Sequence, residues 1–207
     1  MRTIIFMRHG FLEGKYQDYL SLNFKEFEEL LIKIARPQLD EHRNIEALSK
    51  MKILDELDGV ICSSEERAIE TARLVTEKVH LPYKSSSLID EIQFEQGVIT
   101  EEDTASHDFN QLRKKILTQV YHSYHTERFD DIKNRFLRFI HQVEQEKGTT
   151  ILCITHGWFM RLIAIYARRK SLDNISLEEL LAVKPSDFLG TITLELDTPT
   201  PKVKNQF

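Results

Sequence analysis

Short runs of apolar residues along this chain alternate with longer segments whose apolar positions recur every three or four residues. Three runs join apolar and β-branched residues without polar alternation, which is typical of strands buried on both faces: residues 3–7, 60–63 and 149–155. Residues 83–89 are a weaker strand candidate, and residues 191–196 alternate apolar and polar side chains as a half-exposed edge strand does. The longer segments predict helices over 23–36, 45–57, 65–79, 109–124, 129–148, 158–170 and 176–183.

Helix-capping residues support several of these boundaries. Asn23 with Glu26, and Ser176 with Glu179, match the capping-box pattern, and Ser64 stands where it can cap the helix over 65–79. Strands that alternate with helices through short connections predict one α/β domain over residues 1–207, with a doubly wound, mainly parallel sheet sandwiched by helices. The helical segments within 23–57 and 92–128 exceed what simple crossovers need, so they are candidates for a cap.

The composition limits the class of protein. A hydrophobic share of 41% and a charged share of 29% over 207 residues suit a globular protein with a sizeable core. The net charge of −5 gives no overall attraction to nucleic acid, and no apolar run has the pattern of a signal peptide or the length of a membrane span. Cys62 and Cys153 both lie in predicted buried strands, so we expect no disulfide. We therefore expect a cytoplasmic protein that binds neither nucleic acid nor a membrane.

Two of the predicted strands end in the same dipeptide. Arg8-His9-Gly10 follows the first strand, and His156-Gly157 follows the strand over 149–155. Ligands of parallel sheets bind beyond the carboxyl ends of the strands, and neighbouring strands would bring the two imidazoles together there. A single histidine at a strand end is usually a hydrogen-bonded turn residue, but the pair with an adjacent arginine favours a site.

The residues at these positions suit phosphate chemistry. Arg8, with Arg67 in the first turn of its helix, provides guanidinium groups that match phosphate oxygens. A neutral His9 could attack phosphorus, while His156 and the arginines stabilise the transition-state charge. Glu91, directly after a strand, could protonate the leaving alcohol and then activate water. This chemistry needs no cofactor, and no cluster of metal ligands is visible in the sequence.

The motifs together resemble the histidine phosphatase superfamily, also called the phosphoglycerate mutase-like family. They are Arg8-His9-Gly10, the run Ser-Ser-Glu-Glu-Arg-Ala-Ile-Glu-Thr-Ala over 63–72, and His156-Gly157, in the family's order. The resemblance covers residues 3 to about 196 and implies the phosphoglycerate mutase-like fold. It implies His9 as the phosphorylated nucleophile, Arg8, Arg67 and His156 as phosphate ligands with Gly157 beside them, and Glu91 as the proton donor.

The loop after the first motif departs from the family pattern. Members commonly carry Ser or Thr and then Asn there, whereas this chain has Leu12 and Lys15, so Lys15 is a candidate substitute cation. Asp90 is the alternative to Glu91 as proton donor, because strand phase decides which carboxyl points inward. Trp158 could line the pocket or pack beneath it.

The expected function is metal-independent hydrolysis of a phosphomonoester through a phosphohistidine, with inorganic phosphate as product. The substrate is a phosphorylated small molecule or a phosphorylated protein. The alternatives are phosphoglycerate mutase-like phosphoryl transfer and a non-catalytic module that binds phosphate or a phosphorylated partner. The mutases of the family that the chain resembles usually have a longer segment after the acid residue, so the short acidic segment after Glu91 favours a phosphatase over a mutase.

Overall fold

A single five-stranded sheet organises the molecule. The computed structural model describes residues 1–105 and 108–196, and the strand order is β3-β2-β4-β1-β5. All neighbouring strands are parallel except β5, which is antiparallel to β1. The strands are β1 (Arg2–Arg8), β2 (Gly59–Cys62), β3 (Tyr83–Ser85), β4 (Thr150–Thr155) and β5 (Thr191–Leu196). The predicted α/β architecture with a mainly parallel sheet is therefore confirmed.

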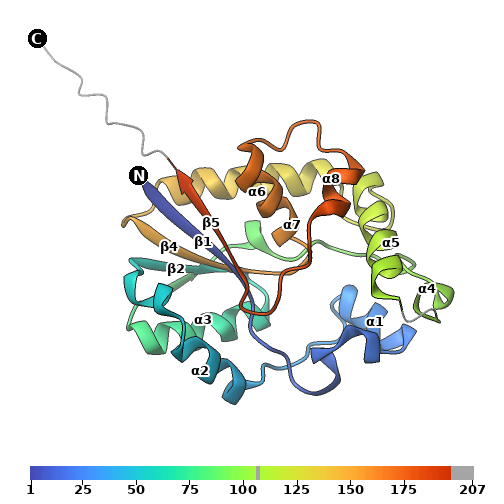
Figure 1. The fold of residues 1–207 in the computed structure, drawn as a ribbon, viewed down its shortest axis with the longest axis horizontal. Coiled ribbons are helices and arrows are strands. Elements are labelled where there is room, and N and C mark those ends of the chain that lie inside the picture. The colour runs from blue at the N-terminus through green and yellow to red at the C-terminus, as the bar shows by residue number, and fades with distance from the viewer. Residues whose placement is uncertain (106–107, 197–207) are drawn as a thin grey trace, which may run out of the picture.

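Helices cover both faces of this sheet. In Figure 1, α2 and α3 lie on one face, α6 and α7 lie on the other, and α1, α4 and α5 lie beyond the carboxyl ends of the strands. The helices are α1 (Phe24–Leu31), α2 (Glu41–Ser49), α3 (Glu66–Val79), α4 (Glu101–Ala105), α5 (Phe109–His122), α6 (Phe129–Glu144), α7 (Met160–Arg169) and α8 (Leu177–Ala182).

The sheet separates two hydrophobic cores, as strands buried on both faces require. Along β1, Ile4 and Phe6 pack into the core formed with α5, α6 and α7, while Ile5 and Met7 pack into the core against α2 and α3. This alternation explains the unbroken apolar run that opens the chain. Cys62 and Cys153 are buried free cysteines in these strands, as predicted. Among the described residues, no helix is apolar over a stretch long enough to cross a membrane.

Both predicted capping boxes are present, at α1 and at α8. The prediction that α1 continues to residue 36 is wrong, because the helix ends at Leu31 and Lys33 adopts a left-handed backbone with a φ of 63°. Ser64 does not cap α3, since its hydroxyl donates to Asp90 instead.

Two other predicted elements are divided in the structure. The helix expected over 45–57 becomes α2 and a separate 3₁₀ helix, Lys52–Glu56, and Ile45 is exposed rather than facing the core. The strand expected over 83–89 becomes β3 and a 3₁₀ turn, Ser87–Ile89. In both cases the second part of the predicted segment forms a short 3₁₀ helix instead of continuing the first element.

Candidate active site

The pairing of β1 with β4 brings the two His-Gly motifs to one edge of the sheet. Arg8 lies opposite Thr155 in the parallel ladder, so the residues that follow each strand are neighbours. The ring centroids of His9 and His156 are 5.3 Å apart. The predicted meeting of the two imidazoles is therefore confirmed.

A small cavity of about 60 Å³ opens at this edge. Its charged wall consists of Arg8, His9, Arg67, Glu91 and Arg161. Its apolar wall is mainly aromatic and comes from Tyr19, Phe27, Phe94, Phe109 and Trp158. Phe27 belongs to α1 and Phe109 to α5. Both helical segments that the sequence indicated as candidates for a cap, within 23–57 and 92–128, therefore contribute to the wall.

His9 is held in one neutral form. Its Nδ1 lies 3.0 Å from the carbonyl oxygen of Gly10, and a carbonyl only accepts, so Nδ1 carries the proton and Nε2 keeps its lone pair. The ring is buried, and burial together with the charges of Arg67 and Arg8 holds its pKa well below the ordinary value. Such a ring is an unprotonated nucleophile near neutral pH.

Gly10 is required at its position by close packing. A Cβ there would lie 2.2 Å from Oδ1 of Asn44, a buried side chain that accepts from Phe11 N at 2.8 Å. The Gly10 backbone N–H donates to Oγ1 of Thr71 at 2.9 Å. The turn after β1 is therefore fixed from α2 and α3, and with it the position of the His9 ring.

His156 is fully buried and supports Arg67. Arg67 donates its Nε–H to Nδ1 of His156 at 3.1 Å, so Nε2 carries the ring proton and donates to Oγ of Ser63 at 2.7 Å. Ser63 in turn donates to Oδ1 of Asp90 at 2.7 Å. Burial and the neighbouring cations, Arg67 first among them, hold the pKa of His156 well below its ordinary value. His156 does not itself line the cavity, and Arg67 does.

Arg8 reaches the cavity from the end of β1. Its Nη1 donates to the carbonyl oxygen of Ser186 and its Nη2 to the hydroxyl of Tyr19, both at 2.6 Å. Its buried Nε has no hydrogen-bond partner within residues 1–105 and 108–196. A Cβ at Gly157 would lie 3.2 Å from that Nε, so the glycine keeps room beside the guanidinium. An unpaired buried donor next to a cavity suits an anionic ligand.

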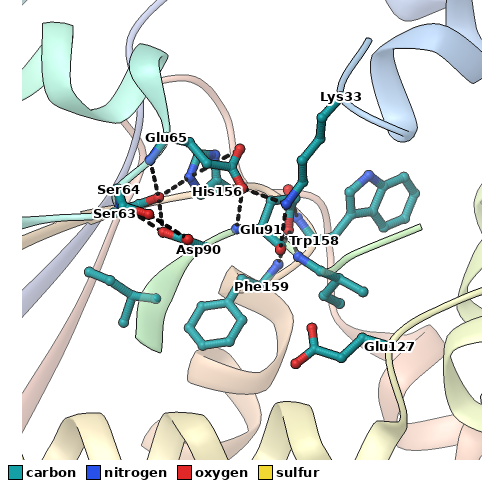
Figure 2. A network of polar contacts seen from close by, with 12 residues as sticks. Lys33, Ser63, Ser64, Glu65, Asp90, Glu91, Glu127, His156, Trp158 and Phe159 are labelled. Atoms are coloured by element: carbon teal, nitrogen blue, oxygen red, sulfur yellow. Dashed lines mark hydrogen bonds and ion pairs between the residues drawn. The ribbon is translucent and has the colours of Figure 1, made fainter. Parts of the chain in front are cut away.

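Glu91 lines the cavity, whereas the Asp90 carboxylate points toward Ser63 and Ser64 (Figure 2). The Glu91 carboxylate accepts from the backbone N–H groups of Ile92, Trp158 and Phe159 at 2.9–3.1 Å. Burial raises the pKa of Glu91 and outweighs the opposing charge of Arg67 and these hydrogen bonds. Between the two adjacent carboxyl groups, only Glu91 lies where it can exchange a proton with a bound molecule.

Lys15 is not brought to this cavity. Its ammonium group forms an ion pair with Glu26, the residue that closes the capping box of α1, and the lysine side chain is half exposed. The ion pair explains why a cation at this position of the loop points outward.

Arg161 and Trp158 complete the wall, and Arg161 was not foreseen. Arg161 is only 3% exposed, donates from Nη1 to the carbonyl of Val183 at 2.6 Å, and has its pKa lowered to about 10 by burial. The available signal was its place between Met160 and Leu162, on an otherwise apolar stretch of the predicted helix. Trp158 lines the cavity, which settles the alternative left open by the sequence.

The described residues contain no group of three His, Cys, Asp or Glu side chains arranged to hold a metal ion. The groups that can bind or react with a ligand are a neutral imidazole, three arginines and a buried carboxyl group, and all of them line one cavity. This set can bind a tetrahedral anion, attack it and supply a proton.

The fold is shared with solved structures of low sequence identity, two of which are phosphatases by name. A mycobacterial glucosyl-3-phosphoglycerate phosphatase superposes with a TM-score of 0.65 at 15% identity, covering 94% of this chain and 93% of that one. Bacillus stearothermophilus YhfR gives 0.61 at 19% identity, with 95% and 92% covered. The alpha-ribazole phosphatase from Shigella flexneri gives 0.60 at 20% identity, with 94% and 91% covered. These likenesses confirm the phosphoglycerate mutase-like fold.

The search of curated proteins gave no match. The comparison with family profiles, however, agrees with the structural comparison. The family profile of the histidine phosphatase superfamily (branch 1) matches residues 38–183, a segment that includes the Arg67, Glu91 and His156 positions. The chain therefore belongs to the histidine phosphatase superfamily, branch 1.

Proposed function

We propose that this protein is a phosphatase that hydrolyses a phosphomonoester through a phosphohistidine at His9. The observation that carries the proposal is the form of His9: a buried neutral ring whose Nδ1 donates to a backbone carbonyl and whose Nε2 has no hydrogen-bond partner in residues 1–105 and 108–196. The same cavity holds two arginines for the phosphate and a carboxyl group for the leaving oxygen.

In the first step Nε2 of His9 attacks phosphorus. The N–P bond forms as the ester P–O bond breaks, and Arg8 and Arg67 stabilise the charge on the phosphoryl oxygens in the transition state. The leaving oxygen takes the proton of Glu91. The raised pKa of Glu91 favours the protonated form that this step needs.

In the second step water attacks the phosphohistidine. Glu91, now ionised, accepts a proton from the water as the new P–O bond forms and the N–P bond breaks. His9 leaves as the neutral ring, and the Gly10 carbonyl keeps it in its starting tautomer. Inorganic phosphate is released, and Glu91 is protonated again for the next cycle.

The cavity favours a phosphorylated small molecule over a phosphorylated protein. Its volume is small, and helices α1 and α5 contribute to its wall. The aromatic side chains opposite the charged end favour a leaving group with apolar surface. The named relatives act on glucosyl-3-phosphoglycerate and on alpha-ribazole phosphate, which are also phosphate esters of small molecules.

The test is phosphate release from phenyl phosphate, with and without a chelator, by the wild-type protein and by His9→Ala. We expect turnover that ignores the chelator and falls by several orders of magnitude in the variant. Turnover that survives in His9→Ala would refute the proposal. Phosphate binding without turnover would favour the binding module, and transfer to an added alcohol without net hydrolysis would favour the mutase.

A further inference from the structure

Glu65 is an anion placed among the groups that bind phosphate. It occupies the N-cap position of α3, yet its side chain makes no capping hydrogen bond. Its carboxylate instead pairs with Nη2 of Arg67 at 2.8 Å and with Nζ of Lys33 at 2.7 Å, and it accepts from the backbone N–H of Glu91 at 2.9 Å. Figure 2 shows it in contact with Lys33 and with the backbone of Glu91.

These contacts fix the guanidinium of Arg67. Glu65 holds Nη2, while Nε donates to Nδ1 of His156 at 3.1 Å, so two of its three nitrogens are held by different elements. A planar group held at two nitrogens has a defined plane and direction. Glu65 also lies 3.7 Å from Nε2 of His156, within the same cluster.

Lys33 connects the segment that follows α1 to this cluster of charged groups. It follows α1 in a left-handed conformation, and besides Glu65 it reaches the carbonyl oxygen of Glu91 at 3.2 Å. The early end of α1 therefore places a cation against the backbone carbonyl of Glu91. Glu65 and Lys33 are 14% and 29% exposed at their side chains, so solvent screens their charges only partly.

We propose that Glu65 is a positioning residue, which orients Arg67 and, with Lys33 as its counter-ion, sets the charge beside Glu91. Its part in proton donation rests on the proposed function. A carboxylate beside Glu91 favours the protonated acid that the first step consumes, and Lys33 limits that influence. The charged groups around Glu91 include Glu65 and Arg67 at the start of α3, Lys33 after α1, Arg161 from α7, Arg8 from β1 in the same cavity, and Arg135 from α6, which donates to the carbonyl of Asp90.

The proposal predicts opposite effects for two substitutions. Glu65→Gln removes a negative charge near Glu91, so the pKa of Glu91 falls and the basic limb of the kcat/KM profile moves to lower pH by about one unit. Lys33→Met removes the counter-ion, so the same limb moves to higher pH. A merely structural loosening would move both variants in the same direction or leave both profiles in place.

The exposed neighbour Glu66 provides the matched control. Glu66→Gln makes the same change of charge and volume one residue away, outside the contacts described, and we expect the wild-type profile. At the pH optimum Glu65→Gln should also lower kcat/KM for phenyl phosphate by about tenfold to a hundredfold, because Arg67 loses one anchor.

A second measurement makes the proposal independent of turnover. The carboxyl carbon of Glu91, labelled with ¹³C and assigned by its absence in Glu91→Gln, can be titrated in the wild type and the three variants. We expect the midpoint to fall in Glu65→Gln, rise in Lys33→Met and stay in Glu66→Gln. Equal midpoints, or shifts of the same sign, would overturn the proposal even if no ester is hydrolysed, and expected shifts in an inactive wild type would instead count against the proposed function alone.

Discussion

Burial of two neutral histidines at one site should make the protein unstable in mild acid. His9 and His156 are 3% and 0% exposed, and both have pKa values held well below 6.5 by burial and neighbouring arginines. In the unfolded chain each ring has an ordinary pKa and takes up a proton as the pH falls. Because the unfolded state then binds more protons than the native state, the free energy of unfolding falls with pH below about 6.5.

The size of this effect follows from proton linkage. Each proton taken up only by the unfolded state changes the free energy of unfolding by about 1.4 kcal/mol per pH unit. For a ring with an unfolded pKa of about 6.5 that stays neutral in the native state, the change from pH 7.5 to 5.5 amounts to about 1.4 kcal/mol. The two histidines together give about 2.7 kcal/mol, a large share of the stability of an ordinary domain.

Urea unfolding followed by the fluorescence of Trp158, the one tryptophan in the sequence, measures this loss. The control is the double variant His9→Gln/His156→Gln, which lacks both titrating rings. Glu91 acts with the opposite sign, because its raised pKa adds stability as the pH falls, but it is present in both proteins. The difference between their pH slopes isolates the histidines, and equal slopes over this range would refute the reasoning.

Three further predictions concern single residues. Glu91→Gln should lower kcat for phenyl phosphate by about 10²–10⁴-fold and much less for 4-nitrophenyl phosphate, whose leaving group needs no proton, and equal losses with both esters would exclude Glu91 as the acid. Gly10→Ala should destabilise the protein by about 1–3 kcal/mol in urea unfolding, because its Cβ would collide with the buried Asn44 amide; an unchanged midpoint would contradict that packing. Lys15→Met should change kcat/KM by less than about twofold, since its ammonium pairs with Glu26 outside the cavity, whereas a tenfold rise in KM would show that it contacts substrate.

The sequence predicted the central sheet because its strands carry a strong and local signal. The unbroken apolar runs of β1 and β4 reflect burial on two faces. The His-Gly dipeptide that follows each strand lies within two residues of its end. Because β1 and β4 are neighbouring parallel strands, the residues that follow them, His9 and His156, lie together at the same edge of the sheet. The capping boxes at Asn23 and Ser176 were readable for the same reason, since each depends on contacts within four residues.

The errors lie where distant contacts decide the local structure. Ser64 has the sequence of a helix cap, but the carboxylate of Asp90, 26 residues away, takes both its hydroxyl and its backbone N–H. α1 ends early, at Leu31, and two residues later the backbone of Lys33 is left-handed and its ammonium pairs with Glu65. Glu65 and Arg161 were missed because their roles depend on three-dimensional neighbours, and the sequence signals only that Arg161 lies in an apolar stretch.

The most direct test of the account is to trap the intermediate. Wild-type protein mixed with phenyl phosphate and quenched within milliseconds should carry one phosphoryl group on His9, stable in alkali and lost in acid, located by peptide mass spectrometry. Glu91→Gln should accumulate more of this adduct from 4-nitrophenyl phosphate, because water activation is impaired while the good leaving group departs unaided. Turnover of the ester with no label on His9, or with label on another residue, would contradict the account.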